Sequence, residues 1–189
     1  MSTLVLEPTI TAQWLGLVKE AEALHHQSLA EDLESYLVFL LARFMEKPEL
    51  VKSVLAMDYL QAFNGVGNQS IKLQDVGDKC LLLAGLFPEC AERKRVNISY
   101  FVELGRGAYS TVADLSKIEM AKLYQALYQE FVSLMDILHA ARELAGAQLS
   151  LLQAESLWSD VKSLHALKIV RQHTQGVLIA NTAASTAKH

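Results

Sequence analysis

The stretch GDKCLLLAGLFPE, residues 77–89, decides how the fold is predicted from this sequence. Its apolar run begins after Gly-Asp and ends at Phe-Pro-Glu. The run is far shorter than the ~20 apolar residues that span a bilayer. Proline ends a helix because it has no amide proton, and glycine lets another backbone approach closely. The stretch therefore predicts a helix that is buried by other helices and ends at Pro88.

Helical spacing dominates the rest of the chain, which holds only three prolines and nine glycines. Apolar residues recur three and four positions apart, and few stretches alternate between apolar and polar residues. The chain has 189 residues, 51% of them hydrophobic and 20% charged, which suffices for a substantial core. We predict an all-α fold: a single compact bundle of about six to eight helices over residues 1–180, followed by a flexible tail over residues 181–189.

The helices are delimited by their apolar periodicity and by capping signals. The first four are expected at about residues 11–27, 28–45, 48–64 and 70–87, with Ser28 and Glu31 forming a capping box for the second. After a helical turn at Pro88, a fifth helix capped by Asn97 is expected to reach about residue 112. The sixth, capped by Asp114, is a long central helix to about residue 146, and the seventh spans about residues 149–173. The sixth is apolar over more than half its circumference, which places it inside the bundle or against a partner.

Charge and targeting signals exclude several classes of protein. The formal net charge of −4 argues against a general nucleic-acid binder, and the basic cluster Arg93-Lys94-Arg95 is typical of a solvated turn. The N-terminus lacks the basic start and apolar core of a signal peptide. Cys80 and Cys90 lack zinc-type spacing and are predicted to be buried thiols. We therefore expect a cytoplasmic protein that binds neither nucleic acid nor membranes.

Two carboxylate–histidine pairs are spaced three residues apart, Glu22 with His25 and Asp136 with His139. One helical turn aims both groups of such a pair at a single metal ion, as in di-iron helical proteins. His25 lies in the middle of the apolar face of its helix. Asp136 is expected on the solvated polar strip of the sixth helix, with His139 at the boundary toward the opposite, apolar side. Glu22 and His25 are therefore the candidate metal ligands.

Two further polar residues fall on apolar helix faces. His165 lies on the apolar stripe of the seventh helix, where we expect either a hydrogen bond to a carbonyl or ligation of haem or a metal. Asp58 has apolar neighbours on the third helix and needs a partner if it is buried. The sequence contains no P-loop, no dinucleotide-binding glycine fingerprint and no nucleophile elbow. It gives no positive sign of an enzyme.

Small residues and charges are concentrated in residues 77–109. Gly85, Gly105 and Ala108 remove side-chain bulk at helical spacing, which predicts that two helices approach closely. A buried ion pair that loses one partner is strongly destabilised, so a pair here would be architectural. We expect at least one ion pair across a helical hairpin between an acid and an arginine of this segment (Asp78, Glu89, Arg93, Arg95 and Arg106).

The same segment resembles a pattern in bacterial all-helical proteins that have no assigned function. The pattern joins Gly-Asp, Gly-x-Phe-Pro-Glu, a basic turn, Tyr-aromatic and Gly-x-x-Ala-Tyr. The resemblance implies a helical fold and no particular activity. The residues that carry it form a structural motif, which we interpret as a packing and ion-pairing hub: Gly77, Asp78, Gly85, Pro88, Glu89, Arg95, Gly105, Arg106 and Tyr109.

A second resemblance concerns LVKEAEALHHQSLAE, residues 17–31, which is similar to the first helix of haem oxygenases. Those proteins are all-helical and of comparable length, and a histidine of that helix holds the haem iron. The resemblance implies His25 as a haem ligand. Gly105 and Gly107 would stand in for the glycine-rich distal helix of the family, whose full motif is absent here.

Two functions from different classes follow from these observations. The leading prediction is a non-enzymatic protein that binds a protein partner in a regulatory or scaffolding role. That partner can be a second copy of the chain, which would form a homodimer through the sixth and seventh helices. This prediction rests on the lack of a catalytic constellation and on an apolar helical surface larger than one bundle can bury. The alternative is a protein that binds haem or iron through His25, with Glu22 or His165 as a further ligand.

Overall fold

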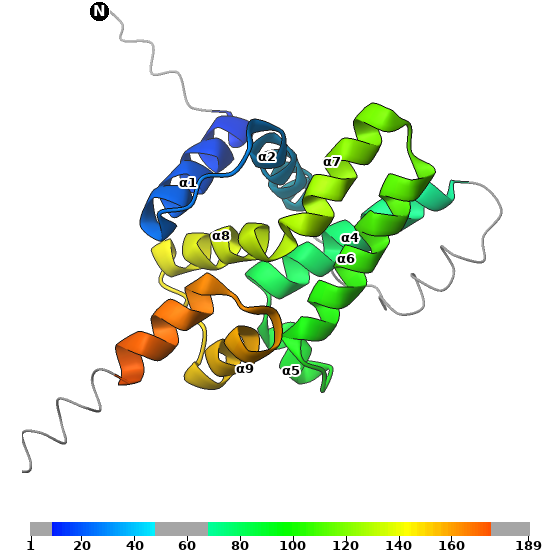
Figure 1. The fold of residues 1–189 in the computed structure, drawn as a ribbon. Coiled ribbons are helices and arrows are strands. Elements are labelled where there is room, and N and C mark those ends of the chain that lie inside the picture. Colours follow the sequence, from blue (N-terminus) through cyan, green and yellow to red (C-terminus); the bar gives the residue numbers. More distant parts are fainter. Residues whose placement is uncertain (1–8, 48–67, 175–189) are drawn as a thin grey trace, which may run out of the picture.

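The computed structural model describes residues 9–47 and 68–174, and these residues form nine helices and no strand (Figure 1). The helices are α1 (Ile10–His25), α2 (Glu31–Glu46), α4 (Gln69–Leu86), α5 (Glu89–Arg93), α6 (Ile98–Leu115), α7 (Ile118–Gln129), α8 (Phe131–Leu144), α9 (Leu151–Val161) and a last helix over residues 164–174. The predicted all-α class is confirmed.

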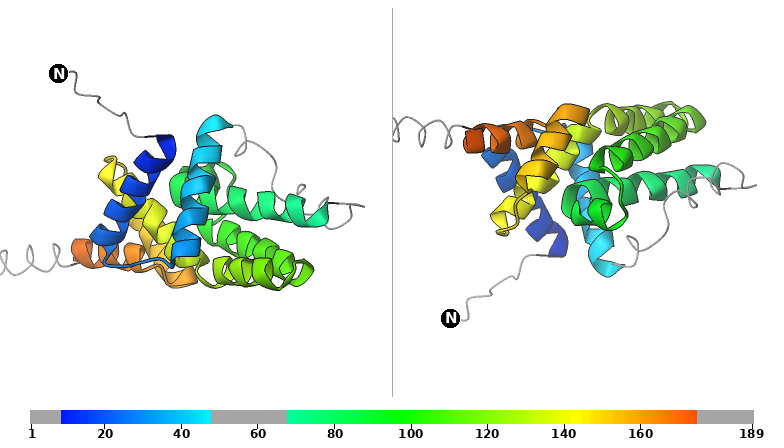
Figure 2. Two further views of the ribbon diagram at one scale, coloured as in Figure 1. Left: turned by 90° about the horizontal axis from the view of Figure 1, so that it is seen from above. Right: turned by 90° about the horizontal axis from the view of Figure 1, so that it is seen from below.

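The centre of the fold is α4. It packs along α6, and α8 lies against its C-terminal half, while Figure 2 shows α2 crossing it. Between Val76 and Gly85 every residue except Lys79 is buried. A helix that is covered on all sides belongs in the middle of a bundle. The buried helix predicted from residues 77–89 is confirmed, and it ends at Leu86, two residues before Pro88.

Glycines allow the helices around α4 to touch its backbone. A Cβ atom on Gly85 would lie 2.6 Å from the Cβ of Leu138 on α8, and one on Gly105 would lie 2.8 Å from the Cβ of Cys80. Atoms at such distances overlap, so any side chain here would push α4 away from α8 or α6. The predicted close approach of two helices is confirmed for α4 and α6.

The long central helix predicted from residue 114 to about residue 146 is wrong. Two helices occupy this region, because the chain bends at Glu130 (φ −93°, ψ 14°) between α7 and α8. Arg106 stabilises the bend: its Nε donates to the carbonyl of Tyr128 at 3.1 Å, and its guanidinium lies 4.6 Å from the centre of the Tyr128 ring. Apolar side chains continue at helical spacing on both sides of Glu130, so the bend leaves no gap in the sequence pattern.

Several predicted caps also differ from the structure. Asp114 lies inside α6, and Lys117 is the N-cap of α7. Ser28 does not cap α2, whose N-cap is Ala30 and receives no side-chain bond. Asn97 is at the predicted N-cap of α6, but its side chain makes no capping hydrogen bond. The capping signals in the sequence therefore predict where these helices begin only to within a few residues.

The predicted seventh helix is divided in two. α9 begins with a capping box between Ser150 and Gln153 and ends at Lys162, which has a left-handed backbone (φ 61°). The second part is the helix over residues 164–174. This break turns the last helix back toward α1 and α8 (Figure 1), and the site described below depends on it.

The predicted third helix with Asp58 and the predicted tail over residues 181–189 lie outside the described residues. The assignment of residues 1–180 to one domain therefore stays a prediction. In residues 9–47 and 68–174, no helix has both the length and the apolar character that a membrane crossing requires.

The glycine contacts predict opposite effects for two alanine substitutions. Gly85→Ala is expected to lower the free energy of unfolding by about 1–3 kcal/mol, because the new methyl group overlaps Leu138. Gly16 lies inside α1 with nothing within 4 Å of its Cβ position. Gly16→Ala should therefore raise the free energy of unfolding by up to about 1 kcal/mol. Denaturant unfolding followed by circular dichroism measures both, and equal stabilities would contradict the close approach of α4 and α8.

Candidate functional site

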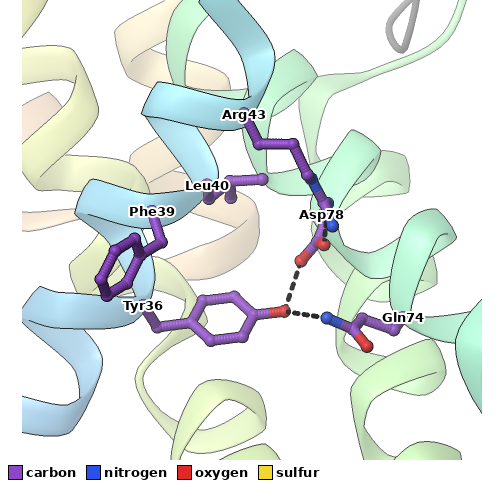
Figure 3. Close-up of a pocket in the computed structure, with 6 residues that line it drawn as sticks. All are labelled: Tyr36, Phe39, Leu40, Arg43, Gln74 and Asp78. Atoms are coloured by element: carbon purple, nitrogen blue, oxygen red, sulfur yellow. Dashed lines mark hydrogen bonds and ion pairs between the residues drawn. The ribbon is translucent and has the colours of Figure 1, made fainter. Parts of the chain in front are cut away.

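A buried carboxylate on α4, that of Asp78, binds polar side chains of α2 and α6, and Figure 3 shows the two from α2, Tyr36 and Arg43. Asp78, only 3% exposed, accepts hydrogen bonds from the hydroxyl of Tyr36 on α2 at 2.6 Å and from that of Tyr109 on α6 at 2.7 Å. It also forms an ion pair with Arg43 of α2. A Cβ on Gly77 would lie 2.5 Å from the Tyr109 ring, so this glycine admits the ring. We call Asp78, Tyr36, Tyr109 and Arg43 the Asp78 cluster.

Burial dominates the electrostatics of the Asp78 cluster. It raises the pKa of Asp78, while the hydrogen bonds from the two tyrosines and the charge of Arg43 favour the ionised carboxylate. Burial and the charge of Asp78 also raise the pKa of Tyr36 and of Tyr109 far above the physiological range. Both phenols therefore remain hydrogen-bond donors. The cluster joins α2, α4 and α6 through one acid whose charge is matched by Arg43.

Two hollows meet beside this cluster. One, of about 150 Å³, is bordered by Asp78 and Arg43, and the other, of about 360 Å³, lies between α2 and α7. Tyr36 and Phe39 border both, so the two hollows are neighbours along α2, and we call them together the α2 groove. Figure 3 shows the Phe39 ring turned away from Asp78. The remaining residues of the groove are Leu40 and Gln74 at one end and Asp32, Ser35, Glu119, Met120 and Leu123 at the other.

The predicted pairing of the acids with nearby arginines is wrong. Asp78 pairs with Arg43, and Glu89 pairs with Arg142 on α8. Both partners are distant in sequence, which is why local spacing did not indicate them. The arginines that were expected to pair serve elsewhere: Arg93 donates to Sγ of Cys90 at 3.0 Å, Arg106 binds Tyr128, and Arg95 is exposed with a φ of 57°.

Three histidines meet where α1, α8 and the last helix join, and we call them the histidine cluster. The ring centres of His25 and His165 are 5.1 Å apart, and those of His139 and His165 are 5.7 Å apart. His139 is 2% exposed and His165 is 1% exposed, whereas His25 is half-buried. The inward position predicted for His165 is confirmed, but His139, expected at a boundary, is buried as well.

Pro88 explains the position of His139. The carbonyl of Ala84, in the last turn of α4, would normally accept the amide proton of residue 88, and proline has none. Nε2 of His139 lies 2.8 Å from this carbonyl oxygen and donates to it. This bond fixes the tautomer of the His139 ring and leaves its Nδ1 without a proton. The carbonyl contact that we expected of His165 is therefore made by His139.

Asp136 holds the beginning of the last helix. Its carboxylate accepts hydrogen bonds from the Ser163 hydroxyl at 2.5 Å and from the amides of Leu164 at 2.9 Å and His165 at 3.2 Å. It thus supplies acceptors for amides that have no partner within their own helix. The predicted solvated position of Asp136 is wrong, since it is 1% exposed. That prediction assumed a straight helix through residue 130.

Burial keeps the histidine cluster uncharged at neutral pH. It lowers the pKa of His139 to about 4 and, with the positive charge of its neighbours, lowers that of His165 to about 3. Burial also lowers the pKa of His25, as does the charge of Lys168. The pKa of Asp136 moves the other way, to about 6, because its carboxylate is buried. Nε2 of His25 and Nδ1 of His139 and of His165 are buried without a hydrogen-bond partner among the described residues.

The described residues contain no group of three His, Cys, Asp or Glu side chains that could hold a metal ion. Glu22, predicted to share an iron with His25, instead accepts the amide of Leu29 at 2.7 Å and lies 3.4 Å from Lys19. Nε2 of His25 is covered and faces away from solvent. The arrangement adds no support to haem or metal binding through these residues, which stays a prediction.

A comparison of the chain with protein-family models, with curated proteins and with solved structures found no significant match. The resemblances to bacterial helical proteins without an assigned function and to haem oxygenases therefore stay expectations. What the protein does has to be argued from the groove and the two clusters.

Sequence analysis missed three residues of the site: Tyr36, Phe39 and Arg43. The sequence did contain a signal for Tyr36 and Arg43, because these two polar residues are seven positions apart and share one helix face. A polar pair on the inward face of an otherwise apolar helix needs a buried partner, and Asp78 is that partner. Nothing in the local pattern distinguishes Phe39 from the buried apolar residues around it.

The Asp78 cluster predicts unequal effects of removing two hydroxyl groups. Tyr109→Phe is expected to lower the free energy of unfolding by about 1–2 kcal/mol, because a buried carboxylate loses a donor. Tyr36→Phe should cost less, since Tyr36 borders the groove and water can replace its hydroxyl. The exposed Tyr100 is the control, and Tyr100→Phe should change nothing measurable. Denaturant unfolding is the assay, and a Tyr109→Phe variant as stable as Tyr100→Phe would refute this role of the hydroxyl.

The histidine cluster predicts a loss of stability in acid. Between pH 6.5 and about 4, the unfolded chain takes up protons on His139 and His165 that the folded protein does not bind. The pKa of His25 is also lowered in the folded protein, so His25 acts in the same direction. Their contribution to the free energy of unfolding therefore falls as the pH falls, by about 1.4 kcal/mol per pH unit and proton. Asp136 opposes this, because its folded form already binds a proton near pH 6, and the raised pKa of Asp78 acts in the same direction.

Replacing one histidine isolates its share of this pH dependence. His165→Leu removes one of the three depressed groups, so the decline of unfolding free energy below pH 6.5 should become shallower than in the wild type. His26→Gln is the control, because His26 is exposed. Guanidinium unfolding at a series of pH values gives the slopes. Parallel curves for His165→Leu and the wild type would show that His165 does not titrate as described.

Proposed function

We propose that this protein works by binding a protein partner through the α2 groove, in a regulatory or scaffolding role, and that the partner is a second copy of the chain. The observation that carries the proposal is Phe39, which is 65% exposed and stands between the two hollows of the groove. Large aromatic side chains that reach solvent beside an apolar depression are typical of protein interfaces. They often provide most of the binding energy.

The apolar surface around Phe39 is extended by α7. Met120, across the groove from Phe39, is 49% exposed, and Ile118 at the beginning of α7 is 78% exposed. This helix belongs to the region that the sequence analysis named as the dimer interface. Burying such side chains stabilises an interface by roughly 25 cal/mol for each Å² of apolar surface.

The charges along α7 favour a second copy over an unrelated partner. Lys117, Glu119 and Lys122 are all exposed and carry both signs of charge within two turns. A two-fold interface must be complementary to itself, and two antiparallel copies of such a helix can place acid opposite base. Phe39 and Met120 of each copy would then enter the groove of the other.

The Asp78 cluster supports binding by fixing one wall of the groove. Tyr36 is held by Asp78 and receives a further hydrogen bond from Nε2 of Gln74 at 3.4 Å. A side chain that is already ordered loses less conformational entropy when a partner binds. We therefore assign Asp78 to positioning the interface and not to acid–base chemistry.

We also propose that the protein works in the cytoplasm and without nucleic acid. Cys80 and Cys90 are both free thiols, which suits a reducing compartment. The net charge of −4 disfavours attraction to phosphate backbones.

The test of the α2 groove is a charge placed at Phe39. The wild type is expected to sediment as a dimer at micromolar concentration, and Phe39→Glu as a monomer, because the new carboxylate would be buried at the interface. Leu152→Glu is the matched control, since Leu152 is an exposed apolar residue (75%) on α9, and this variant should remain a dimer. A monomeric wild type, or dissociation by Leu152→Glu but not by Phe39→Glu, would sink the proposal.

A further inference from the structure

A further hollow lies beside His25 of the histidine cluster, between the last turn of α1 and the helix over residues 164–174. Its volume is about 620 Å³, within the range of small-molecule sites. Its lining is basic at His25, His26, Lys168 and Arg171. We call it the basic hollow. It shares no residue with the α2 groove.

The last helix turns two different faces to its surroundings. His165, Ala166 and Ile169 are buried and attach it to the core. A second face lines the basic hollow with residues at positions i, i+3, i+4 and i+7: Leu164, Leu167, Lys168 and Arg171. This spacing is one continuous stripe on a helix. The hollow thus combines apolar side chains with two cations on a single surface, and Leu24 of α1 faces them.

Among the described residues, the cations of the basic hollow have no counter-charge. No carboxylate of residues 9–47 or 68–174 lines the hollow, and neither Lys168 nor Arg171 forms an ion pair with any of these residues. Two acids lie near the histidines without lining the hollow: Glu143, whose Oε2 is 3.8 Å from Nε2 of His165, and Asp136, which accepts the amide of His165. Lys168 is only half-exposed, and its charge acts on both His25 and His165. An anion in the hollow would therefore meet two cations whose charge no described carboxylate neutralises.

We propose that the basic hollow binds a small amphipathic anion, with an apolar body and one carboxylate or phosphate group. Leu24, Leu164 and Leu167 would contact the apolar body. Lys168 and Arg171 would bind the anionic group through charge-assisted hydrogen bonds. The site is independent of the dimer interface proposed above.

Ligand binding should also change the titration of His25. The positive charge of Lys168 lowers the pKa of His25, and a bound anion would offset that charge. The pKa of His25 should therefore rise when the hollow is occupied. The groups that face His25 are His26 on its own helix, His139 and Glu143 on α8, and His165 and Lys168 on the last helix.

The experiment uses the full chain and isothermal titration calorimetry with decanoate, below the concentration at which it forms micelles. Decanol tests the apolar body without the charge, and inorganic phosphate tests the charge without the apolar body. We expect decanoate to bind at least about tenfold more tightly than either, a difference that one charge-assisted contact supplies. NMR titration should show a higher pKa for His25 in the presence of decanoate.

Variants assign the binding to the hollow. Lys168→Gln/Arg171→Gln should weaken decanoate binding by about tenfold or more, whereas Lys72→Gln/Lys94→Gln, which removes two exposed cations outside both proposed sites, should not. Circular dichroism confirms that both variants are folded. Phe39→Glu should bind decanoate like the wild type, which separates this site from the α2 groove.

Several results would overturn the inference. They are failure of decanoate to bind, equal affinity for decanol, and binding that survives Lys168→Gln/Arg171→Gln. Vesicles of phosphatidylglycerol form a further arm of the experiment. Binding to vesicles without binding of free decanoate would mean that the cations meet a membrane surface, and this too would overturn the assignment of a small-molecule site.

Discussion

The structure depends on one constraint: the C-terminal half of α4 is almost completely enclosed. From Val76 to Gly85 neighbouring helices cover every residue except Lys79, and glycine is present at three close contacts, Gly77, Gly85 and Gly105. A helix enclosed in this way cannot leave polar groups without partners, because desolvation of an unpaired group is costly. Asp78 and the carbonyl of Ala84 are two polar groups of this buried half that need partners from other helices, and a cluster of polar side chains has formed around each. The helix that is packed most tightly thus decides where the polar residues of the other helices must lie.

Much of the fold could be predicted from local signals, and the reason for each failure is physical. The end of α4 was found from Pro88, and the close packing from glycine spacing, because both signals act through the backbone at the residue itself. The bend at Glu130 was missed because it is stabilised from another helix by Arg106, while the apolar periodicity continues. That single error displaced Asp136 from the core to the surface in the prediction. A helix bend rotates every later residue, so an undetected bend misassigns a whole face.

The site was predicted in part for a related reason. His25 and His165 were singled out from their positions on apolar faces and Asp78 as an acid in need of an ion-pair partner, and all three belong to clusters in the structure. Their partners were not found, because Arg43 and His139 are far from them in sequence and reach them only through the packing of α2 and α8. Burial of a polar residue can be inferred from one helix, but the identity of its partner is a property of two. The sequence therefore indicates that a partner is needed without indicating which one it is.

The two clusters also explain how one small protein presents two surfaces of opposite character. The Asp78 cluster fixes Tyr36 at the wall of the α2 groove, and Asp136 with the histidine cluster fixes the helix that lines the basic hollow. Asp78 and Ala84 are six residues apart on α4, or about 9 Å along its axis. The side chains that fix the two surfaces are therefore anchored to the same rigid helix, α4. Rigidity of this kind holds two sites at a constant separation, but coupling between them would require an element with two arrangements. The structure shows the last helix in a single arrangement. It is attached through Asp136, whose pKa is raised to about 6, and through His139 and His165, whose pKa values are lowered to about 4 and about 3. Its attachment therefore depends on these two buried histidines remaining uncharged.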